Sequence, residues 1–230
     1  MIDVRKFDSL GHANHGWLNA RHHFSFADYH DPSRMGWGRI RVWNDDQIAA
    51  KSGFPPHPHR DMEIVTYVRT GAITHQDSMG NKGRTAAGEV QVMSAGTGVV
   101  HAEYNLEDEQ TTLFQIWIET DTPSAKPSWG AKPFPKHSRE GKFQVLASGN
   151  GDDGALSINA DAKILGATVK AGESIAVETQ PDRHLYLVPS GRVRVNGVEA
   201  NSRDGVAITG ESRVEIDAED DSELVLVDAR

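Results

Sequence analysis

The feature that most constrains the fold is a series of short, β-branched segments that recur along the chain. Their side chains often alternate between apolar and polar, and clusters of Gly, Asp, Asn or Pro bound most of them. Alternation of this kind predicts half-buried strands, and frequent turns between short strands are typical of sandwiches and barrels. No long amphipathic helix stands out, so the sequence predicts an all-β fold. The expected strands include residues 63–69, 89–93, 112–119, 185–188 and 192–195.

One turn is predicted more firmly than the others. Asn196 and Gly197 stand between the apolar segments 192–195 and 198–200. Both central positions of the commonest two-residue hairpin turn need a positive φ, which Asn and Gly adopt readily. We therefore expect a β-hairpin that turns at Asn196-Gly197.

A change of composition divides the chain. Residues 121–141 carry four prolines among scattered lysines and serines, which is typical of a connector. At roughly 100–200 residues per domain, a chain of 230 residues can hold one large domain or two small ones. We place the boundary in this connector and expect an N-terminal domain of residues 1–137 and a C-terminal domain of residues 138–230.

The two predicted domains resemble each other weakly. Apolar strands occupy similar places relative to a Gly turn in both halves. The run 63–71 can be laid on 183–191, and the run 88–93 on 204–209. On the first alignment His57 and His59 fall opposite Val177 and Thr179. Any two antiparallel segments can be aligned this loosely, but the pattern favours a duplicated fold whose second copy lacks the histidines.

Charge and cysteine content exclude several classes of function. The formal net charge is −9, and no basic stripe or block of like charges appears. An acidic chain of this kind is a poor ligand for nucleic-acid phosphates or for an anionic membrane surface. The absence of cysteine excludes disulfides, thiolate metal sites and thiol nucleophiles. The 11 histidines are the first indication of chemistry, because imidazole is a common metal ligand.

Targeting signals are not evident. The start of the chain, residues 1–6, lacks the apolar core of a signal peptide. No apolar run approaches the roughly 18 residues that span a bilayer. We therefore expect a soluble, cytoplasmic protein without a membrane partner.

Two pairs of side chains have the spacing of metal ligands. His57 and His59 are separated by one residue, as are His101 and Glu103. On a strand, positions i and i+2 share a face and lie about 6.5–7 Å apart, so both members of a pair can reach one ion. Pro58 lacks a backbone donor, which requires an edge strand, a bulge or a strand start. Either pair alone is more often a surface coincidence than a site.

Context strengthens the metal interpretation. Each pair follows a Gly-containing turn and lies beside a strong predicted strand. The long gap between His59 and His101 suits ligands on separate strands of one barrel. If those strands are neighbours, the two pairs could place four ligands around one ion.

The residues around these pairs resemble two cupin motifs and, more specifically, the pirin family. Seven residues separate Glu63 from Gly71 where the general cupin pattern has six, and Ser94 stands where Pro is common; both departures are pirin-like. The resemblance has strong motifs over residues 5–119 and is looser over 142–230. The matching segments are Gly11–Trp17, His22–Phe26, Gly53–Glu63, Gly88–Asn105 and, as in bacterial members assigned as quercetin 2,3-dioxygenases, His75–Asn81.

The resemblance implies a bicupin, which is two jelly-roll β-barrels in one chain. The N-terminal barrel would bind the metal and the C-terminal barrel would be degenerate. In pirins the ligands match His57, His59, His101 and Glu103, whereas the general cupin pattern would use Glu63. A Glu four residues beyond His59 on a continuing strand keeps the same parity, so parity alone does not exclude it. Following the pirin pattern, we expect Glu63 to support the site or the fold.

The ligand set and the resemblance together predict a function. Three imidazoles and one carboxylate suit Fe(II) first, and also Mn, Co, Ni, Cu or Zn, with open positions for a substrate. The resemblance implies a dioxygenase that cleaves a flavonol such as quercetin with O₂ and releases carbon monoxide, with Glu103 taking the proton of the substrate hydroxyl. The alternative is a non-enzymatic metal-binding regulator that acts through a protein partner. We expect a monomer that does not contact nucleic acid directly.

The remaining histidines and aromatics are assigned ordinary roles. Packing, hydrogen bonding or surface exposure is expected for His12, His15, His22, His23, His30, His75, His137 and His184. His22 and His23 could line the mouth of the site. An apolar pocket wall could be formed by Phe24, Phe26, Trp43 and Phe54, although aromatics in a barrel are more often plain core.

Overall fold

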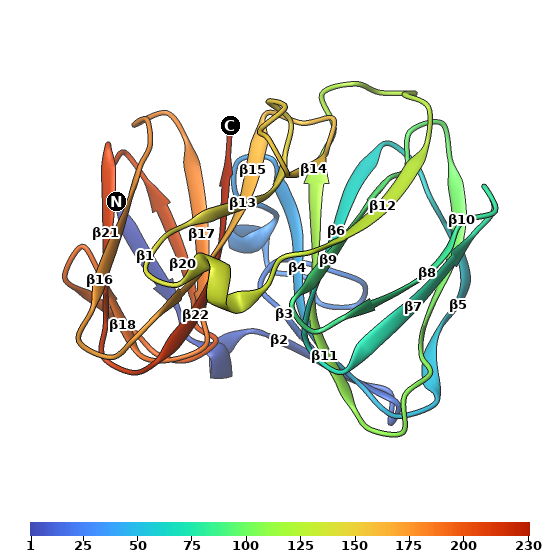
Figure 1. The fold of residues 1–230 in the computed structure, drawn as a ribbon, viewed down its shortest axis with the longest axis horizontal. Helices are drawn as coiled ribbons and strands as arrows, with labels where there is room; N and C mark the ends of the chain where they lie inside the picture. The colour runs from blue at the N-terminus through green and yellow to red at the C-terminus, as the bar shows by residue number, and fades with distance from the viewer.

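The computed structural model describes residues 1–230 and shows two β-barrels side by side (Figure 1). Helix is confined to three short 3₁₀ segments, η1 (Phe7–Ser9), η2 (Pro32–Arg34) and η3 (Lys136–Arg139). None of these is long or apolar enough to cross a membrane. The expected all-β bicupin is confirmed.

The first barrel consists of a seven-stranded and a four-stranded sheet. In sheet order, the larger sheet contains β12 (Ser128–Pro133), β9 (Glu89–Ser94), β6 (Met62–Thr70), β11 (Thr111–Glu119), β4 (Ile40–Ile48), β3 (Leu18–His22) and β2 (Gly11–Asn14). The smaller sheet contains β5 (Ser52–His59), β10 (Val99–Asn105), β7 (Ala72–Asp77) and β8 (Lys82–Ala86).

The second barrel repeats this plan. Its larger sheet contains β1 (Ile2–Arg5), β20 (Gly205–Thr209), β17 (His184–Pro189), β22 (Ser222–Ala229), β15 (Ala162–Val169), β13 (Gln144–Ser148) and β14 (Leu156–Ser157). Its smaller sheet contains β16 (Ser174–Glu178), β21 (Arg213–Ala218), β18 (Val193–Val195) and β19 (Val198–Ala200). In sheet order, β17 and β20 correspond to β6 and β9, as the sequence alignment of the two halves predicts.

The N-terminal strand crosses to the other barrel. β1 pairs antiparallel with β20, in the place that β12 holds beside β9 in the first barrel. The predicted first domain, residues 1–137, includes this strand, so its residues 2–5 pair with the other barrel. The boundary after residue 137 falls in η3 and stays a prediction.

The predicted hairpin is present. Val195 pairs with Val198, and Asn196 and Gly197 have φ angles of 44° and 82° between them. The turn residues are therefore those that a positive φ at both positions requires.

The two large sheets pack face to face. A cluster of 23 buried residues joins side chains of β4, β6, β9 and β11 to those of β13, β15, β17, β20 and β22. On β6, Val65 and Tyr67 belong to this cluster, whereas Ile64 and Val68 belong to small clusters inside the first barrel. Residues on the two faces of β6 thus pack into different cores, one between the barrels and one inside the first barrel.

The interiors of the two barrels differ. The second barrel is filled by a cluster of 16 buried apolar residues. The first barrel has apolar clusters of only six and three buried residues. Buried polar side chains, among them Thr66, Gln91, Glu103 and Gln115, also lie in this barrel. A barrel interior of this kind has room and polarity for a ligand, which the second barrel lacks.

Candidate metal centre

The two histidine segments lie on neighbouring strands. β5 is the edge strand of the four-stranded sheet and pairs antiparallel with β10, and His57 stands directly opposite His101. The edge position explains how a strand can contain Pro58, which has no backbone N–H to donate. The sequence prediction of an edge, bulge or strand start at Pro58 is confirmed.

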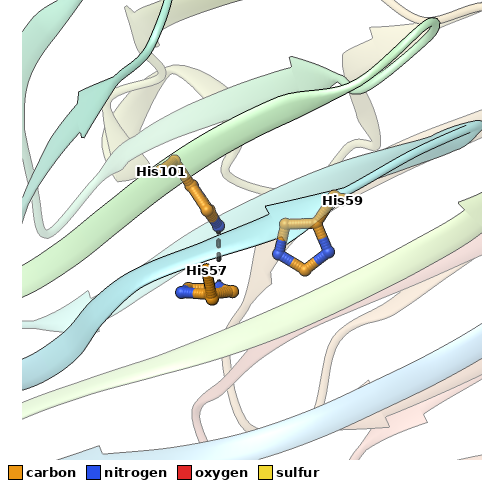
Figure 2. Close-up of side chains that lie close together, drawn as sticks. All are labelled: His57, His59 and His101. Atoms are coloured by element: carbon orange, nitrogen blue, oxygen red, sulfur yellow. Dashed lines mark hydrogen bonds between the residues drawn. The ribbon is translucent and has the colours of Figure 1, made fainter.

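Three imidazoles meet in front of this sheet. Figure 2 shows His57 and His59 on one strand and His101 on its neighbour, with the dashed line joining His57 and His101. The ring centroid of His101 lies 4.5 Å from that of His57 and 4.8 Å from that of His59. One ligand nitrogen from each ring lies within 4.8 Å of the others.

The spacing fits one shared ion. The Nε2 atoms of His57 and His101 are 3.0 Å apart. Two nitrogens bound at about 2.1 Å and at right angles to each other would be about 3.0 Å apart. His57 Nδ1 donates to the carbonyl oxygen of Pro55 at 2.8 Å, which leaves the lone pair on Nε2 free to bind a metal.

Burial keeps two of the rings neutral. Desolvation, with a smaller contribution from His57, lowers the pKa of His59 to about 4. Desolvation, together with the neighbouring His57 and His59, lowers the pKa of His101 to about 2. A neutral imidazole is the form that binds metals, so these rings are prepared as ligands at neutral pH.

Glu103 lies beside this cluster with its carboxylate held in place. A register shift between His101 and Glu103 interrupts the pairing of β10 with β5. The side-chain amides of Gln91 and Gln115 donate to its two oxygens at 2.7 and 2.8 Å. Burial raises the pKa of Glu103 to about 7, against the opposing effect of these donors. Glu103 forms a second potential ligand group with His101 and His75, separate from the group of His57, His59 and His101.

A fourth histidine, His75, lies beside His101 on the side away from His57. The Nδ1 atoms of His75 and His101 are 3.4 Å apart, and His75 Nε2 lies 2.9 Å from Asp77 Oδ2. Burial lowers the pKa of His75, so the ring is neutral and its Nε2–H donates to Asp77. His75 Nδ1 can then accept from His101 Nδ1–H, which turns the Nε2 lone pair of His101 toward His57. The ring of His75 also stacks on Trp129 at 4.9 Å and 12°.

Glu63 faces away from the imidazole cluster. β5 ends at His59 and β6 begins at Met62, with Asp61 between them at a φ of 47°. The assumed continuing strand is therefore wrong, and the parity argument does not apply. Glu63 accepts from Ser94 Oγ at 2.5 Å and from Asn159 of the second half at 3.4 Å. It thus supports the contact between the barrels.

A single cavity contains all four predicted ligands. Its volume is about 150 Å³. Apolar and aromatic side chains make much of the wall. The lining residues are Leu18, Ala20, His22, Phe26, Asn44, Asp46, Phe54, His57, His59, Ile64, His101, Glu103, Gln115 and Trp117.

The other predicted wall residues divide between this cavity and the core. Phe26, Phe54 and His22 line the cavity. His23 points the other way, toward Tyr186 of the second barrel, with 2.9 Å between His23 Nδ1 and the Tyr186 hydroxyl. Phe24 and Trp43 belong to the inter-barrel core.

Three candidate residues of the site, His75, Asp77 and Asp46, were not predicted from the sequence. His75 was assigned a structural role, although His75 and Asp77 share the i, i+2 spacing that identified the ligand pairs. Asp46 could not be identified from the sequence, because an acidic residue within a run of polar residues is expected to lie on the surface. In the structure, burial and the charges of Asp45 and Glu103 raise the pKa of Asp46 to about 8.

Two jelly-roll barrels, one with a histidine cluster on adjoining strands, define a bicupin. A family model described as pirin matches residues 3–118, and one described as a quercetinase C-terminal cupin domain matches residues 145–229. The chain belongs to the pirin family.

Similar proteins cover the whole chain. A pirin-like protein of Caulobacter vibrioides is 63% identical over 231 residues, which is 100% of both chains. A quercetin 2,3-dioxygenase of Escherichia coli strain K12 is 44% identical and covers 99% of this chain and 98% of its own. The crystal structure of the bacterial pirin YhhW from E. coli in complex with nickel(II) matches with a TM-score of 0.94 at 42% identity, over 100% of this chain and 99% of that one.

Proposed function

We propose that this protein is a metal-dependent dioxygenase that cleaves flavonols with O₂ and releases carbon monoxide. The observation that carries the proposal is a cluster of three imidazoles beside a buried carboxylate in a cavity with aromatic walls. The quercetin dioxygenase name of the E. coli relative supports the choice of substrate.

The proposed ligands are His57, His59, His101 and Glu103. Three neutral imidazoles and one carboxylate leave a divalent ion with a charge of about +1 and, in an octahedron, two free positions. Fe(II) is our first choice, with Mn, Co, Ni, Cu or Zn as alternatives. The nickel complex of the E. coli relative supports a divalent ion.

Glu103 is the proposed base. When bound, the ion would act as a Lewis acid that lowers the pKa of the substrate's 3-hydroxyl. Glu103 would accept the proton, with Gln91 and Gln115 holding its carboxylate in position. Phe26, Phe54 and Trp117 would hold the flat rings and keep water out.

The chemistry balances without a further reductant. O₂ adds across C2 and C4 of the deprotonated flavonol. The O–O bond and the C2–C3 and C3–C4 bonds then break, and C3 leaves as carbon monoxide with its own oxygen. Both atoms of O₂ stay in the depside product, which regains the proton from Glu103.

Metal-loaded protein tests the proposal directly. The protein is loaded separately with Fe, Mn, Co, Ni and Cu and mixed with quercetin in air. We expect at least one metal to give carbon monoxide together with loss of the flavonol absorption band. Bound metal with neither signal would reject the dioxygenase and leave a metal-binding protein that acts through a partner.

A further inference from the structure

Asp46 has no protein partner inside the cavity. It lies on β4, in the sheet that faces His57 and His101 across the barrel, and only 2% of its surface is exposed. No side chain or backbone group donates a hydrogen bond to it, and its Oδ1 is fully enclosed. Asp46 nevertheless lines the cavity.

Several neighbouring polar groups of the wall are paired with one another or with Glu103. His22 Nδ1 donates to Asn44 Oδ1 at 2.7 Å. Gln115 donates to Glu103 at 2.8 Å and accepts from Thr66 at 2.9 Å. Two wall residues outside the histidine cluster have a buried polar atom without a partner, Asp46 at Oδ1 and Trp117 at Nε1. Asp46 is the acceptor of the two, so it can accept a hydrogen bond from a ligand.

Folding alone does not explain a carboxyl group here. In register, Asp46 stands between Ala20 of β3 and Leu113 of β11, both apolar and buried. A buried polar group without a partner destabilises a fold, and an apolar side chain would suit this position better. Asp46 is also outside both groups of potential metal ligands, so a metal ion does not account for it.

We propose that Asp46 selects hydroxylated substrates by forming a hydrogen bond with a flavonol hydroxyl other than the one at the metal centre. This inference rests on the proposed function, and it narrows the substrate to polyhydroxylated flavonols. A hydroxyl suits this position, because it is neutral and can donate a hydrogen bond to the unpaired carboxyl group. Sites that hydrogen-bond a substrate hydroxyl reject analogues that lack it, because the protein group is then left unpaired.

Binding measured without oxygen tests the inference. Dissociation constants are determined anaerobically on metal-loaded protein for quercetin and for 3-hydroxyflavone, which keeps only the hydroxyl at the metal centre. We expect the wild type to prefer quercetin, Asp46→Leu to lose about tenfold or more of that preference, and Asp46→Asn, which keeps an oxygen at the site, to retain most of it. Asp46→Ala makes the same comparison if leucine does not fit.

Thermal unfolding separates recognition from a structural role. Without metal or ligand, Asp46→Leu should unfold at a higher temperature than the wild type, because it removes an unpaired buried carboxyl group. An unchanged preference for quercetin in both Asp46→Leu and Asp46→Ala would overturn the inference.

The inference and the proposed function can fail separately. A preference that depends on Asp46, in a protein that forms no carbon monoxide in air, would keep the inference and reject the dioxygenase. Carbon monoxide formation with an unchanged preference in the Asp46 variants would keep the dioxygenase and reject the inference about Asp46.

Discussion

His101 is contacted on both sides of its ring, by His57 at Nε2 and by His75 at Nδ1. His101→Ala removes the middle ligand of the proposed set, so purified protein should contain little or no metal. Elemental analysis measures this, and His137→Ala, at an exposed histidine of η3, is the matched control. Metal content equal to that of the control would contradict the ligand assignment.

Asp77 acts on the metal centre only through His75. The carboxylate accepts from the backbone N–H groups of Met79 and Asn81 at 2.9 and 3.0 Å, which fixes it beside the ring. Asp77→Asn should weaken metal affinity by less than the about 10–100-fold that follows loss of a direct partner of a ligating histidine, because His75 stands between Asp77 and His101.

Competition with a chelator measures that affinity. Asp153→Asn, at an exposed carboxylate, serves as control. Equal affinities in the two variants would show that the orientation of His75 does not matter.

Asp46 should make the metal-free protein less stable as the pH rises. Its pKa is about 8 in the folded protein and about 3.9 in an unfolded chain, so between these values the folded state binds more protons. Its contribution to stability is complete below about pH 4 and is lost as the pH rises through about 8.

Asp46→Asn cannot ionise. Its stability relative to the wild type should therefore grow from about pH 5 to about pH 8, by at most about 1.4 kcal/mol per pH unit. Urea unfolding at several pH values measures the difference. A difference that is constant with pH would contradict the raised pKa.

At the scale of the residue, the histidine cluster could be predicted from the sequence better than its surroundings. His57, His59 and His101 could be found because strand parity is a local property. The burial of Asp46 could not be predicted, because it depends on the pairing of β4 with β3 and β11 within the barrel. The orientation of Glu63 could not be predicted either, because a single residue with positive φ, Asp61, ends the strand that parity assumed.

Among the elements, the β18–β19 hairpin could be predicted from the sequence, whereas the addition of β1 to the edge of the second barrel could not. Asn196-Gly197 specifies its turn locally, whereas the pairing of β1 with β20 joins residues at opposite ends of the chain. In the second barrel, valines stand where the first barrel has its histidine cluster. Val177 pairs with Val214 where His57 pairs with His101, and both valines pack with the apolar core.

The β18–β19 turn offers a test confined to the second barrel. Gly197 has a φ of 82°, so Gly197→Ala should destabilise the protein by about 1–2 kcal/mol. Metal affinity should not change, because the ligands lie in the other barrel. Denaturant unfolding and metal titration measure the two effects, and an unaltered midpoint would contradict the strain at this turn.

The whole molecule should unfold as one unit. Ile116 of β11 is fully buried in the core that the two large sheets share. Ile116→Ala should cost about 2–5 kcal/mol and lower a single unfolding transition, since neither sheet can expose this face alone. Calorimetry measures this, and two separate transitions with only one displaced would contradict a shared core.

The central claim concerns where the oxygen atoms go. Metal-loaded protein is supplied with quercetin and ¹⁸O₂, and mass spectrometry follows the label in both products. The proposed cleavage predicts both labelled atoms in the depside and none in the carbon monoxide, with no reaction in His101→Ala. A single labelled atom in the depside, or label in the carbon monoxide, would contradict it.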